Sequence, residues 1–546
     1  MAALFLSAAS AHAYDFESDG ICYNVLSEED RTVEVTRRDR YNYSGSIIIP
    51  ERVLHEGKTY TVTSIRDYAF SGCGALTSVV FPASLTSIGY YAFRDCGALT
   101  SVDLSSTSLT SIRDGAFYNC VALTSVDLSS TSLTSIRDGA FYNCDALTSV
   151  AFPASLTSIG YETFSGCEAL TSVAFPASLT SIGDHAFSGC DALTSVDLSS
   201  TSLTSIGDEA FSGCDVLTGV AFPASLTSIG YGAFYGCEAL TSVDLSSTSL
   251  TSIGEYAFRD CVALTSVSFP ASLTSIGNRA FRDCVALTSV DLSSTSLTSI
   301  GEYAFRDCDA LTSVDLSSTS LTSIGDEAFS GCDVLTGVAF PASLTSIGDE
   351  AFSGCEALTN LTVDESNPAF ASRDNVLYSK SLDTLVCYPA GLGKEVVIPE
   401  MVRSVRYDAF PGDVDTVYCQ PQTPPTAVDG EFQDMFSSDE LMNAVLYVPV
   451  GTKAAYMQVD PWRNFWNIEE SDFATVGIDG VTAQGEPTVT VRGGKIVVDG
   501  ASTTGVIEVF STDGRCAYRG TSTVIEGLPK GAYVVRIGKF TQKVML

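Results

Sequence analysis

The residues of this chain best suited to chemistry are its cysteines, because most of them recur at one fixed spacing. The 546-residue sequence contains 17 cysteines. In an exported protein, regularly spaced cysteines can form disulfides, and together with histidines they can bind zinc. Which role applies depends on the elements that hold the thiols. Thirteen cysteines follow one another at intervals of 23 or 24 residues, at Cys73, Cys96, Cys120, Cys144, Cys167, Cys190, Cys214, Cys237, Cys261, Cys284, Cys308, Cys332 and Cys355.

Each of these cysteines belongs to a repeated motif. The motif reads A-F-S-G-C-x-A-L-T-S-V, followed by x-F-P-A-S-L-T-S-I-G or by the longer D-L-S-S-T-S-L-T-S-I-G. A fixed period of roughly 20 to 50 residues is typical of a solenoid, in which each repeat forms one rung of a stack. Val102, Asp103 and Leu104 alternate as a short parallel strand requires. The segment that contains A-F predicts a further short extended piece and about one helical turn.

The stacking of rungs would place the repeated cysteines in register. Neighbouring strands lie about 4.8 Å apart, but their parallel Cβ vectors disfavour the dihedral angle of a disulfide. An odd number of cysteines also cannot pair completely. The sequence has no C-x-x-C motif and no Cys/His cluster, which argues against a metal site. We therefore expect buried free thiols that act as small apolar fillers, with disulfides as the alternative.

The residue before each repeated cysteine indicates where the backbone turns. Only Gly, Asn and Asp occupy this position. These residue types tolerate a left-handed backbone, so we expect the chain to swing there into the next strand. The position after S-I is usually Gly but is Arg66, Arg113 and Arg137 in three rungs, so a positive φ is not required there.

Aspartates occupy an outward position of the predicted strand in the longer rungs. Asp103 and Asp127, and likewise Asp291 and Asp315, should be neighbours about 5 Å apart. In water, the repulsion between two such charges is about 1 kcal/mol, so a solvated acidic face is one interpretation. The alternative is that the pairs attract a cation such as calcium or a basic partner. These four aspartates are the metal candidates.

Tyrosines gather beside the predicted helical turn, where the rungs differ most. Such an aromatic edge suits contact with a protein or a glycan, and partly buried packing is the alternative. Tyr118, Tyr142 and Tyr235 extend the same edge. The candidate ligand contacts are Tyr68, Tyr90, Tyr91, Tyr161, Tyr231, Tyr256 and Tyr303.

Composition excludes several functional classes. The chain is 45% hydrophobic and 17% charged, which argues against disorder, and its net charge of −36 argues against nucleic-acid binding. No stretch of 18 apolar residues follows the N-terminus, so we expect no membrane-spanning segment. Catalysis needs unlike groups at one place, whereas the rungs are near copies and lack the common catalytic and dinucleotide-binding fingerprints. We therefore expect neither an enzyme nor a cofactor.

The chain divides into six predicted regions. Residues 1–13 resemble the end of a signal peptide, whose A-H-A site would release Tyr14. No basic residue precedes the apolar run, which suggests a truncated start. Residues 14–60 predict an N-terminal β cap, and residues 61–359 predict the solenoid. Residues 360–418 predict an irregular insertion and a degenerate last repeat, and residues 419–472 predict a small α/β region. Residues 473–546 predict a C-terminal β-sandwich.

The repeat L-T-S-I-G-D-E-A-F-S-G-C-E-A-L-T-S-V resembles that of BspA-type leucine-rich-repeat proteins of anaerobic, mostly Bacteroidetes, bacteria. The resemblance covers residues 61–410. The tail, with G-V-I-E-V-F-S-T-D-G-R and L-P-K-G-A-Y-V-V-R-I-G, more loosely resembles the C-terminal sorting domain of the type IX secretion route. Together these resemblances imply a secreted or outer-surface protein, often an adhesin for host matrix or bacterial partners, and no catalytic residues.

Two functions therefore follow from the sequence. The first is a surface adhesin that contacts extracellular proteins or glycans. The second is a structural surface-layer or spacer protein without a specific ligand. Near-identical repeats fit both, because a uniform surface can bind at many points or merely extend. The ligand and the oligomeric state cannot be read from the sequence.

Overall fold

The computed structural model describes residues 14–38, 42–317, 320–428 and 435–473, and in the C-terminal region residues 488–492, 495–499, 507–511, 515–520, 522, 524–537 and 540–545. The predicted signal peptide, residues 1–13, lies outside the described residues. The chain forms two compact units, one of residues 1–358 and 364–369 and the other of residues 359–363 and 370–546. Among the described residues, no helix has the length and apolar character needed to cross a bilayer.

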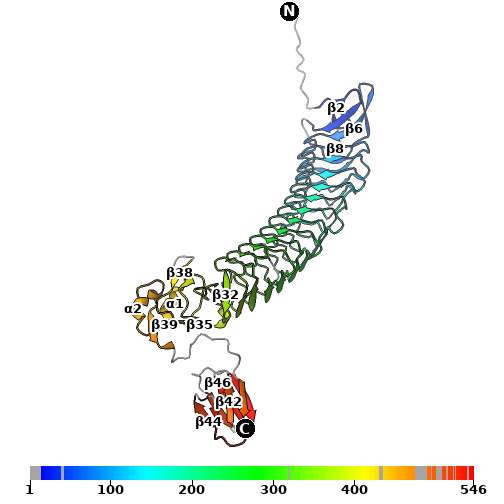
Figure 1. Ribbon diagram of the computed structural model, residues 1–546. Helices are drawn as coiled ribbons and strands as arrows, with labels where there is room; N and C mark the ends of the chain where they lie inside the picture. The colour runs from blue at the N-terminus through cyan, green and yellow to red at the C-terminus, as the bar shows by residue number, and fades with distance from the viewer. Residues whose placement is uncertain are drawn as a thin grey trace, which may run out of the picture. The chain divides into compact units, whose positions relative to one another are not determined.

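The first unit is a solenoid in which each rung contributes two short strands to two parallel ladders (Figure 1). Ser and Val of S-V-x pair with the same residues one rung on, for example Val126 with Val102 and with Val150. This ladder comprises β9 (Ser101–Asp103), β11 (Ser125–Asp127), β13 (Ser149–Ala151), β15 (Ser172–Ala174), β17 (Ser195–Asp197), β19 (Gly219–Ala221), β21 (Ser242–Asp244), β23 (Ser266–Ser268), β25 (Ser289–Asp291), β27 (Ser313–Asp315) and β29 (Gly337–Phe340).

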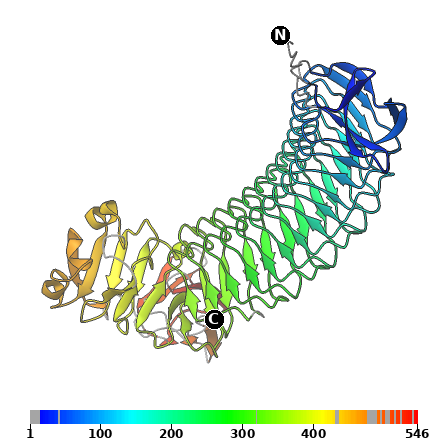
Figure 2. The same ribbon diagram turned by 90° about the horizontal axis from the view of Figure 1, so that it is seen from above.

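The second ladder is built from the S-I dipeptides. Its register is equally regular, since Ile112 pairs with Ile88 and with Ile136. Its strands are β8 (Ser87–Ile88), β10 (Ser111–Ile112), β12 (Ser135–Ile136), β14 (Ser158–Ile159), β16 (Ser181–Ile182), β18 (Ser205–Ile206), β20 (Ser228–Ile229), β22 (Ser252–Ile253), β24 (Ser275–Ile276), β26 (Ser299–Ile300), β28 (Ser323–Ile324) and β30 (Ser346–Ile347). The view from above in Figure 2 shows the rungs stacked one on the next. The predicted solenoid fold is therefore confirmed.

The N-terminal cap is an antiparallel sheet that continues into the parallel S-I ladder. β1 (Phe16–Ser18), β2 (Ile21–Ser27) and β3 (Thr32–Thr36) pair antiparallel in that order. β3 then pairs parallel with β6 (Lys58–Ile65). β6 in turn pairs antiparallel with β5 (Arg52–His55) and parallel with β8. β4 (Gly45–Ile48) covers β7 (Leu76–Val80), the S-V strand of the first rung. The cap thereby pairs with β8, the first strand of the S-I ladder, and with β7, the S-V strand of the first rung.

The third side of each rung, which joins the S-I strand to the cysteine, is not helical. The sequence predicted about one helical turn here, whereas the structure has successive tight turns. In one of them the Cys73 N–H donates to the carbonyl of Phe70, three residues earlier, at 3.0 Å. The peptide groups also bond between rungs, as the Phe70 N–H does to the Ala92 carbonyl at 2.7 Å. A helix would direct these groups along its own axis, so bonding between rungs excludes it.

Two left-handed residues per rung produce this geometry. The residue before each repeated cysteine has a positive φ in every rung, as predicted, from 52° at Asn143 to 73° at Gly72. The residue before each A-F or T-F pair is also left-handed, including Tyr68 at 59° and Arg279 at 56°. This second position was missed, because tyrosine, glutamate and arginine carry no left-handed preference that a sequence could reveal.

The core of the first unit is a column of identical residues. Phe187, Phe211 and Phe234 are fully buried, and their rings stack at 5.3 and 5.4 Å between centroids. The stack runs through every repeat from Phe70 to Phe352. Leucine, valine and isoleucine of the two strands fill the remaining interior. The repeated apolar positions are therefore core residues.

The second unit contains two more parallel ladders. β34 (Thr384–Cys387), β36 (Ser404–Arg406) and β38 (Thr426–Val428) form one, which β33 (Val376–Ser379) and β32 (Phe370–Arg373) extend antiparallel. β35 (Glu395–Ile398), β37 (Thr416–Cys419), β39 (Val445–Pro449) and β40 (Asn467–Ser471) form the other. Rung-like pairing thus occurs where the sequence predicted an irregular insertion and an α/β region, because strands pair here without the cysteine motif.

Short helices and a small aromatic core complete this region. α1 (Ser438–Asn443) begins with a capping box between Ser437 and Glu440, and α2 spans Lys453–Tyr456. η1 (Ala390–Leu392) and η2 (Trp462–Asn464) are single 3₁₀ turns, and β31 spans Asn360–Val363. Trp462 is fully buried and donates its indole N–H to the Pro425 carbonyl at 2.7 Å. Its ring packs edge-on against Phe436 and Tyr456, which gives this region a small aromatic core.

The C-terminal region contains two antiparallel sheets. The first contains β41 (Thr488–Arg492), β42 (Lys495–Asp499) and β45 (Val524–Ile525). The second contains β43 (Ile507–Ser511), β44 (Cys516–Gly520), β46 (Ala532–Ile537) and β47 (Phe540–Met545). Both sheets contribute to one hydrophobic cluster that includes Ile496 and Val509.

Candidate functional site

The candidate site is the turn edge, which we define as the segment of each rung from the residue after S-I to the cysteine, such as Gly207–Cys214. Alanine, phenylalanine and cysteine of this segment point inward and are buried. The residues after Gly, before Ala and after Phe are those that vary between rungs. Left-handed backbone at two positions per rung holds these variable side chains in repeated places.

The structure brings several predicted tyrosines together at the N-terminal end of the turn edge. The Tyr68 and Tyr91 rings stack at 5.6 Å, and Tyr91 meets Tyr118 edge-on at 6.1 Å. Tyr118 in turn stacks on Tyr142 at 4.7 Å. One row of aromatic rings therefore crosses the first four rungs. Tyr90, the residue before Tyr91, is 37% exposed.

The other predicted tyrosines lie farther along the array. Tyr231 and Tyr256 contact each other with ring centroids 5.1 Å apart. Tyr161 lies against His185 at 5.5 Å instead of a second tyrosine, and Tyr303 packs against arginine. Tyr161 and Tyr231 are 45% and 44% exposed, whereas Tyr256 and Tyr303 are half-buried. The set thus contains exposed and half-buried members, and the packing interpretation applies to Tyr256 and Tyr303, whereas ligand contact stays a prediction for the exposed tyrosines.

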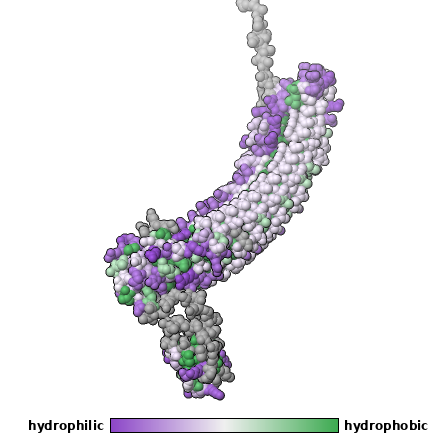
Figure 3. Space-filling model, in the orientation of Figure 1, coloured by the Kyte–Doolittle hydropathy of each residue, from purple (hydrophilic) through white to green (hydrophobic). Residues whose placement is uncertain are grey.

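Arginine is the component of the turn edge that the sequence analysis missed. Residues 61–359 contain eight basic residues, every one of them an arginine on the turn edge: Arg66, Arg94, Arg113, Arg137, Arg259, Arg279, Arg282 and Arg306. Arg94 lies 5.6 Å from the ring centres of both Tyr91 and Tyr118. The signal was available, because no lysine or arginine occurs on the strands of these rungs. Figure 3 shows hydrophilic residues along one margin of the array beside a nearly neutral face.

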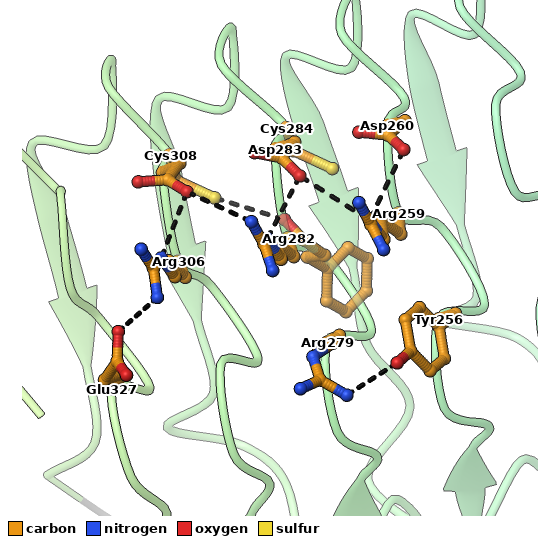
Figure 4. A network of polar contacts seen from close by, with 12 residues as sticks. Tyr256, Arg259, Asp260, Arg279, Arg282, Asp283, Cys284, Arg306, Cys308 and Glu327 are labelled. Atoms are coloured by element: carbon orange, nitrogen blue, oxygen red, sulfur yellow. Dashed lines mark hydrogen bonds and ion pairs between the residues drawn. The ribbon is translucent and has the colours of Figure 1, made fainter. Parts of the chain in front are cut away.

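The C-terminal group of arginines is neutralised by acidic residues in a continuous network (Figure 4). Arg259 pairs with Asp260 at 3.3 Å and with Asp283 at 3.5 Å. Arg282 pairs with Asp283 at 3.1 Å and with Asp307 at 3.8 Å. Each guanidinium thus joins its own rung to the next, so the arginines in this part of the turn edge have a structural role.

The same network continues to either side. Arg306 pairs with Asp307 at 3.2 Å and with Glu327 of the following rung. Arg279 donates to the Tyr256 hydroxyl at 2.5 Å, and its guanidinium lies 4.6 Å from the centre of the Tyr303 ring (Figure 4). Tyr256 and Tyr303 therefore both contact arginine, which leaves less of these two side chains available to a ligand.

The predicted aspartate neighbours do lie side by side on the strands. Asp103 faces Asp127, and Asp291 faces Asp315, in the register of the S-V ladder. In each, Oδ1 accepts the N–H of the serine two residues on, at 3.0 Å from Ser105 to Asp103. Hydrogen bonds from the Ser105 side chain and backbone lower the pKa of Asp103. Within the described part of the chain, no group of three or more His, Cys, Asp or Glu residues could hold a metal ion.

The repeated cysteines are free, buried and hydrogen-bonded. The Cys96 thiol donates to the Phe70 carbonyl of the preceding rung at 3.1 Å, and Cys120 donates likewise to Phe93 at 3.2 Å. Burial raises the pKa of the Cys120 thiol to about 12. The thiol is thus a small core residue that also satisfies a carbonyl, which the filler interpretation did not include.

Comparison with known proteins gives the following matches. The sequence model for the "BspA type Leucine rich repeat region" matches in six copies across residues 58–167, 134–265 and 251–381. No curated protein matches the chain.

Solved structures with a similar chain path include three bacterial proteins. A leucine-rich repeat protein from Bacteroides ovatus is 23% identical, covers 84% of this chain and 100% of its own, and has a TM-score of 0.49. A leucine-rich cell surface protein from Faecalibacterium prausnitzii is 31% identical, with coverages of 64% and 95% and a TM-score of 0.44. The pneumococcal vaccine antigen PcpA is 18% identical, with coverages of 84% and 98% and a TM-score of 0.37.

Proposed function

We propose that this chain, which belongs to the family of BspA-type leucine-rich repeat proteins, is a secreted or cell-surface binding protein that attaches to extracellular proteins or glycans. Attachment would use the turn edge. On this proposal the protein is an adhesin and has no catalytic activity.

The observation that carries the proposal is that every tyrosine and arginine of residues 61–359 lies on the turn edge. The residues that form the strands and the core are nearly identical from rung to rung, as a scaffold requires. The tyrosines and arginines of the turn edge differ between rungs, and Tyr68, Tyr161 and Tyr231 are 44% to 47% exposed. Tyrosine and arginine are the residues most enriched at protein interfaces.

Location at the surface is part of the same proposal. Residues 1–13 would direct export, and residues 473–546 would act as a sorting domain of the type IX route. The strands of that tail form two small antiparallel sheets around one hydrophobic cluster, which is compatible with a compact sorting module.

Saturable binding of the full chain to immobilised matrix proteins and to a glycan array tests the proposal. The expected result is a saturable signal on a defined subset of surfaces, competed by excess unlabelled chain. The spacer hypothesis predicts that the protein is displayed on cells but gives only a linear, non-competed signal. That result would overturn the adhesin proposal.

A further inference from the structure

We propose that the N-terminal end of the turn edge binds an anionic polysaccharide, one that bears carboxylate or sulfate groups, through the guanidinium groups of Arg113 and Arg137. This inference rests on the proposed binding function and specifies its ligand. It follows from two arginines on adjacent rungs that make no ion pair among the described residues, from a cavity beside the first of them, and from the spacing of the rungs.

The cavity lies where the N-terminal cap meets the first rungs and has a volume of about 630 Å³. Its walls are polar and carry charges of both signs. Asn24 and Glu34 come from the cap, whereas Arg66, Asp67 and Arg113 come from the first three rungs. A ligand here would meet hydrogen-bonding groups on several sides, as small-molecule and carbohydrate sites require.

The carboxylates of this cavity already have partners. Glu34 accepts a hydrogen bond from the Asn24 amide at 3.2 Å and pairs with Arg66 at 3.6 Å. Asp67 accepts the backbone N–H of Tyr90 at 2.8 Å. Asp15, the third carboxylate, accepts a backbone N–H from β2 at 2.8 Å. These groups are therefore satisfied without a cationic ligand.

Arg113 is the basic residue of the cavity that makes no ion pair. Its guanidinium lies 5.0 Å from the centre of the Tyr90 ring, and within the described ranges it makes no ion pair. Arg137 occupies the same position one rung on, since Ile112 and Ile136 are paired, and it too has no acidic partner among the described residues. Both side chains are exposed. Two unpaired cations on adjacent rungs favour an anion between them.

The C-terminal arginines differ from Arg113 and Arg137 because they make ion pairs. Arg259 and Arg282 each pair with two aspartates, so their charge is already neutralised. The chain as a whole has a net charge of −36, which repels a polyanion from most of the surface. Arg279 also makes no ion pair among the described residues, but it lies between the Tyr256 and Tyr303 rings, at 5.3 and 4.6 Å from their centres. Arg113 and Arg137 are the neighbouring pair of arginines on adjacent rungs without such ion pairs, so an anionic partner is directed to them.

A polysaccharide fits this place better than an acidic peptide. The S-I strand that precedes Arg113 is paired on both sides, with β8 and with β12, so it offers no free edge to which a peptide strand could add. Tyr90, which is 37% exposed, lies beside the Arg113 guanidinium. A flat ring next to a cation suits a sugar ring that carries an acidic group. Successive cations about 4.8 Å apart also match a chain with repeated charges.

The test measures binding of the full chain to four probes: heparin, polygalacturonate, poly-L-glutamate and neutral dextran. The variant is Arg113→Gly with Arg137→Gly, because glycine occupies the same position in most other rungs, as Gly160 does in the next. The matched control is Arg259→Ser with Arg282→Ser, since Ser212 occupies that position in another rung. Both double variants lose two positive charges, so they differ only in where the charge is lost.

The expected result is salt-sensitive binding of heparin, polygalacturonate or both, weakened about tenfold or more in the glycine variant and unchanged in the serine control. Equal loss in both variants would show that net charge alone governs binding and would overturn the site. Arginine-dependent binding of poly-L-glutamate but not of the two glycans would replace the polysaccharide with an acidic peptide. Equal binding of dextran, or no binding of any probe, would also overturn the proposal.

The outcomes separate this inference from the proposed function. If the full chain binds matrix or cell surfaces and the glycine variant binds them equally well, the polysaccharide site is wrong and the binding function stands. If the chain binds the anionic glycans in solution but attaches to no surface, the site stands and the adhesin proposal is wrong.

Discussion

Replacing Phe211 by alanine tests whether the stacked column of phenylalanine rings holds the rungs together. The Phe211 side chain is fully buried, and its ring lies 5.3 Å from Phe187 and 5.4 Å from Phe234, within 5° of parallel to each. Truncation of a buried phenylalanine costs about 3–5 kcal/mol, and each lost aromatic pair adds about 0.5–1.5 kcal/mol. We therefore expect the free energy of unfolding to fall by about 4–8 kcal/mol.

The matched control is Phe269→Ala on a shorter rung. Phe269 is half-buried and makes one edge-on ring contact, with Phe281 at 6.0 Å, so its loss should cost about 1–3 kcal/mol. Urea unfolding followed by circular dichroism measures the change, and hydrogen exchange locates it. Because each rung contacts only its neighbours, protection should fall first in rungs near the substitution. A loss below about 2 kcal/mol for Phe211→Ala, or equal losses for the two variants, would refute the stacking account.

Four further predictions address the backbone, the thiols and the aspartates. Asn119 has a φ of 58°, so Asn119→Val should lower the free energy of unfolding by about 1–2 kcal/mol while Asn119→Gly does not; equal denaturation midpoints would contradict a left-handed requirement. Burial raises the pKa of Cys120, Cys167 and Cys214 from 9.0 to about 12, so unfolded thiols ionise first, and stability should fall as pH rises from 9 toward 12. In native protein, iodoacetamide at pH 8 should label exposed Cys516 but not these thiols, and mass spectrometry that finds array labelling would contradict the burial. Calcium and chelator should give the same melting temperature, because each paired aspartate already accepts a backbone N–H; a rise with calcium would support a site at Asp103 and Asp127 or at Asp291 and Asp315.

The parts of the fold that the sequence predicted are those where one residue type carries one physical role. The fixed period predicted the stack of rungs, and Gly, Asn or Asp before each cysteine predicted the left-handed residue there. The position after S-I was predicted not to need a positive φ. Its glycines have another cause: a Cβ at Gly207 would lie 2.5 Å from the Gly183 carbonyl carbon of the preceding rung. Such an approach between rungs is a property of the stack and has no local sequence signal.

The remaining features could not be read from single residues. The left-handed backbone at Tyr68 and Arg279 is imposed by hydrogen bonds between rungs, against the preference of those residue types. The tyrosines were located on one edge, but which are exposed depends on whether an arginine or another ring packs on them. The charge balance of Arg113 and Arg282 also depends on which acidic side chains the neighbouring rungs supply.

The central claim is that the turn edge is the recognition surface, and one comparison tests it most directly. Tyr90→Asn with Tyr91→Gly replaces two aromatic residues by types found at the same positions in other rungs, Asn278 and Gly115, so the rung should still fold. Trp466→Ala, which removes an aromatic side chain that is 76% exposed outside the array, is the control. A surface to which the wild-type chain binds should capture less of the tyrosine variant and an unchanged amount of the tryptophan variant. The unfolding midpoints of both variants are measured in parallel. Wild-type capture by a correctly folded tyrosine variant would contradict the claim.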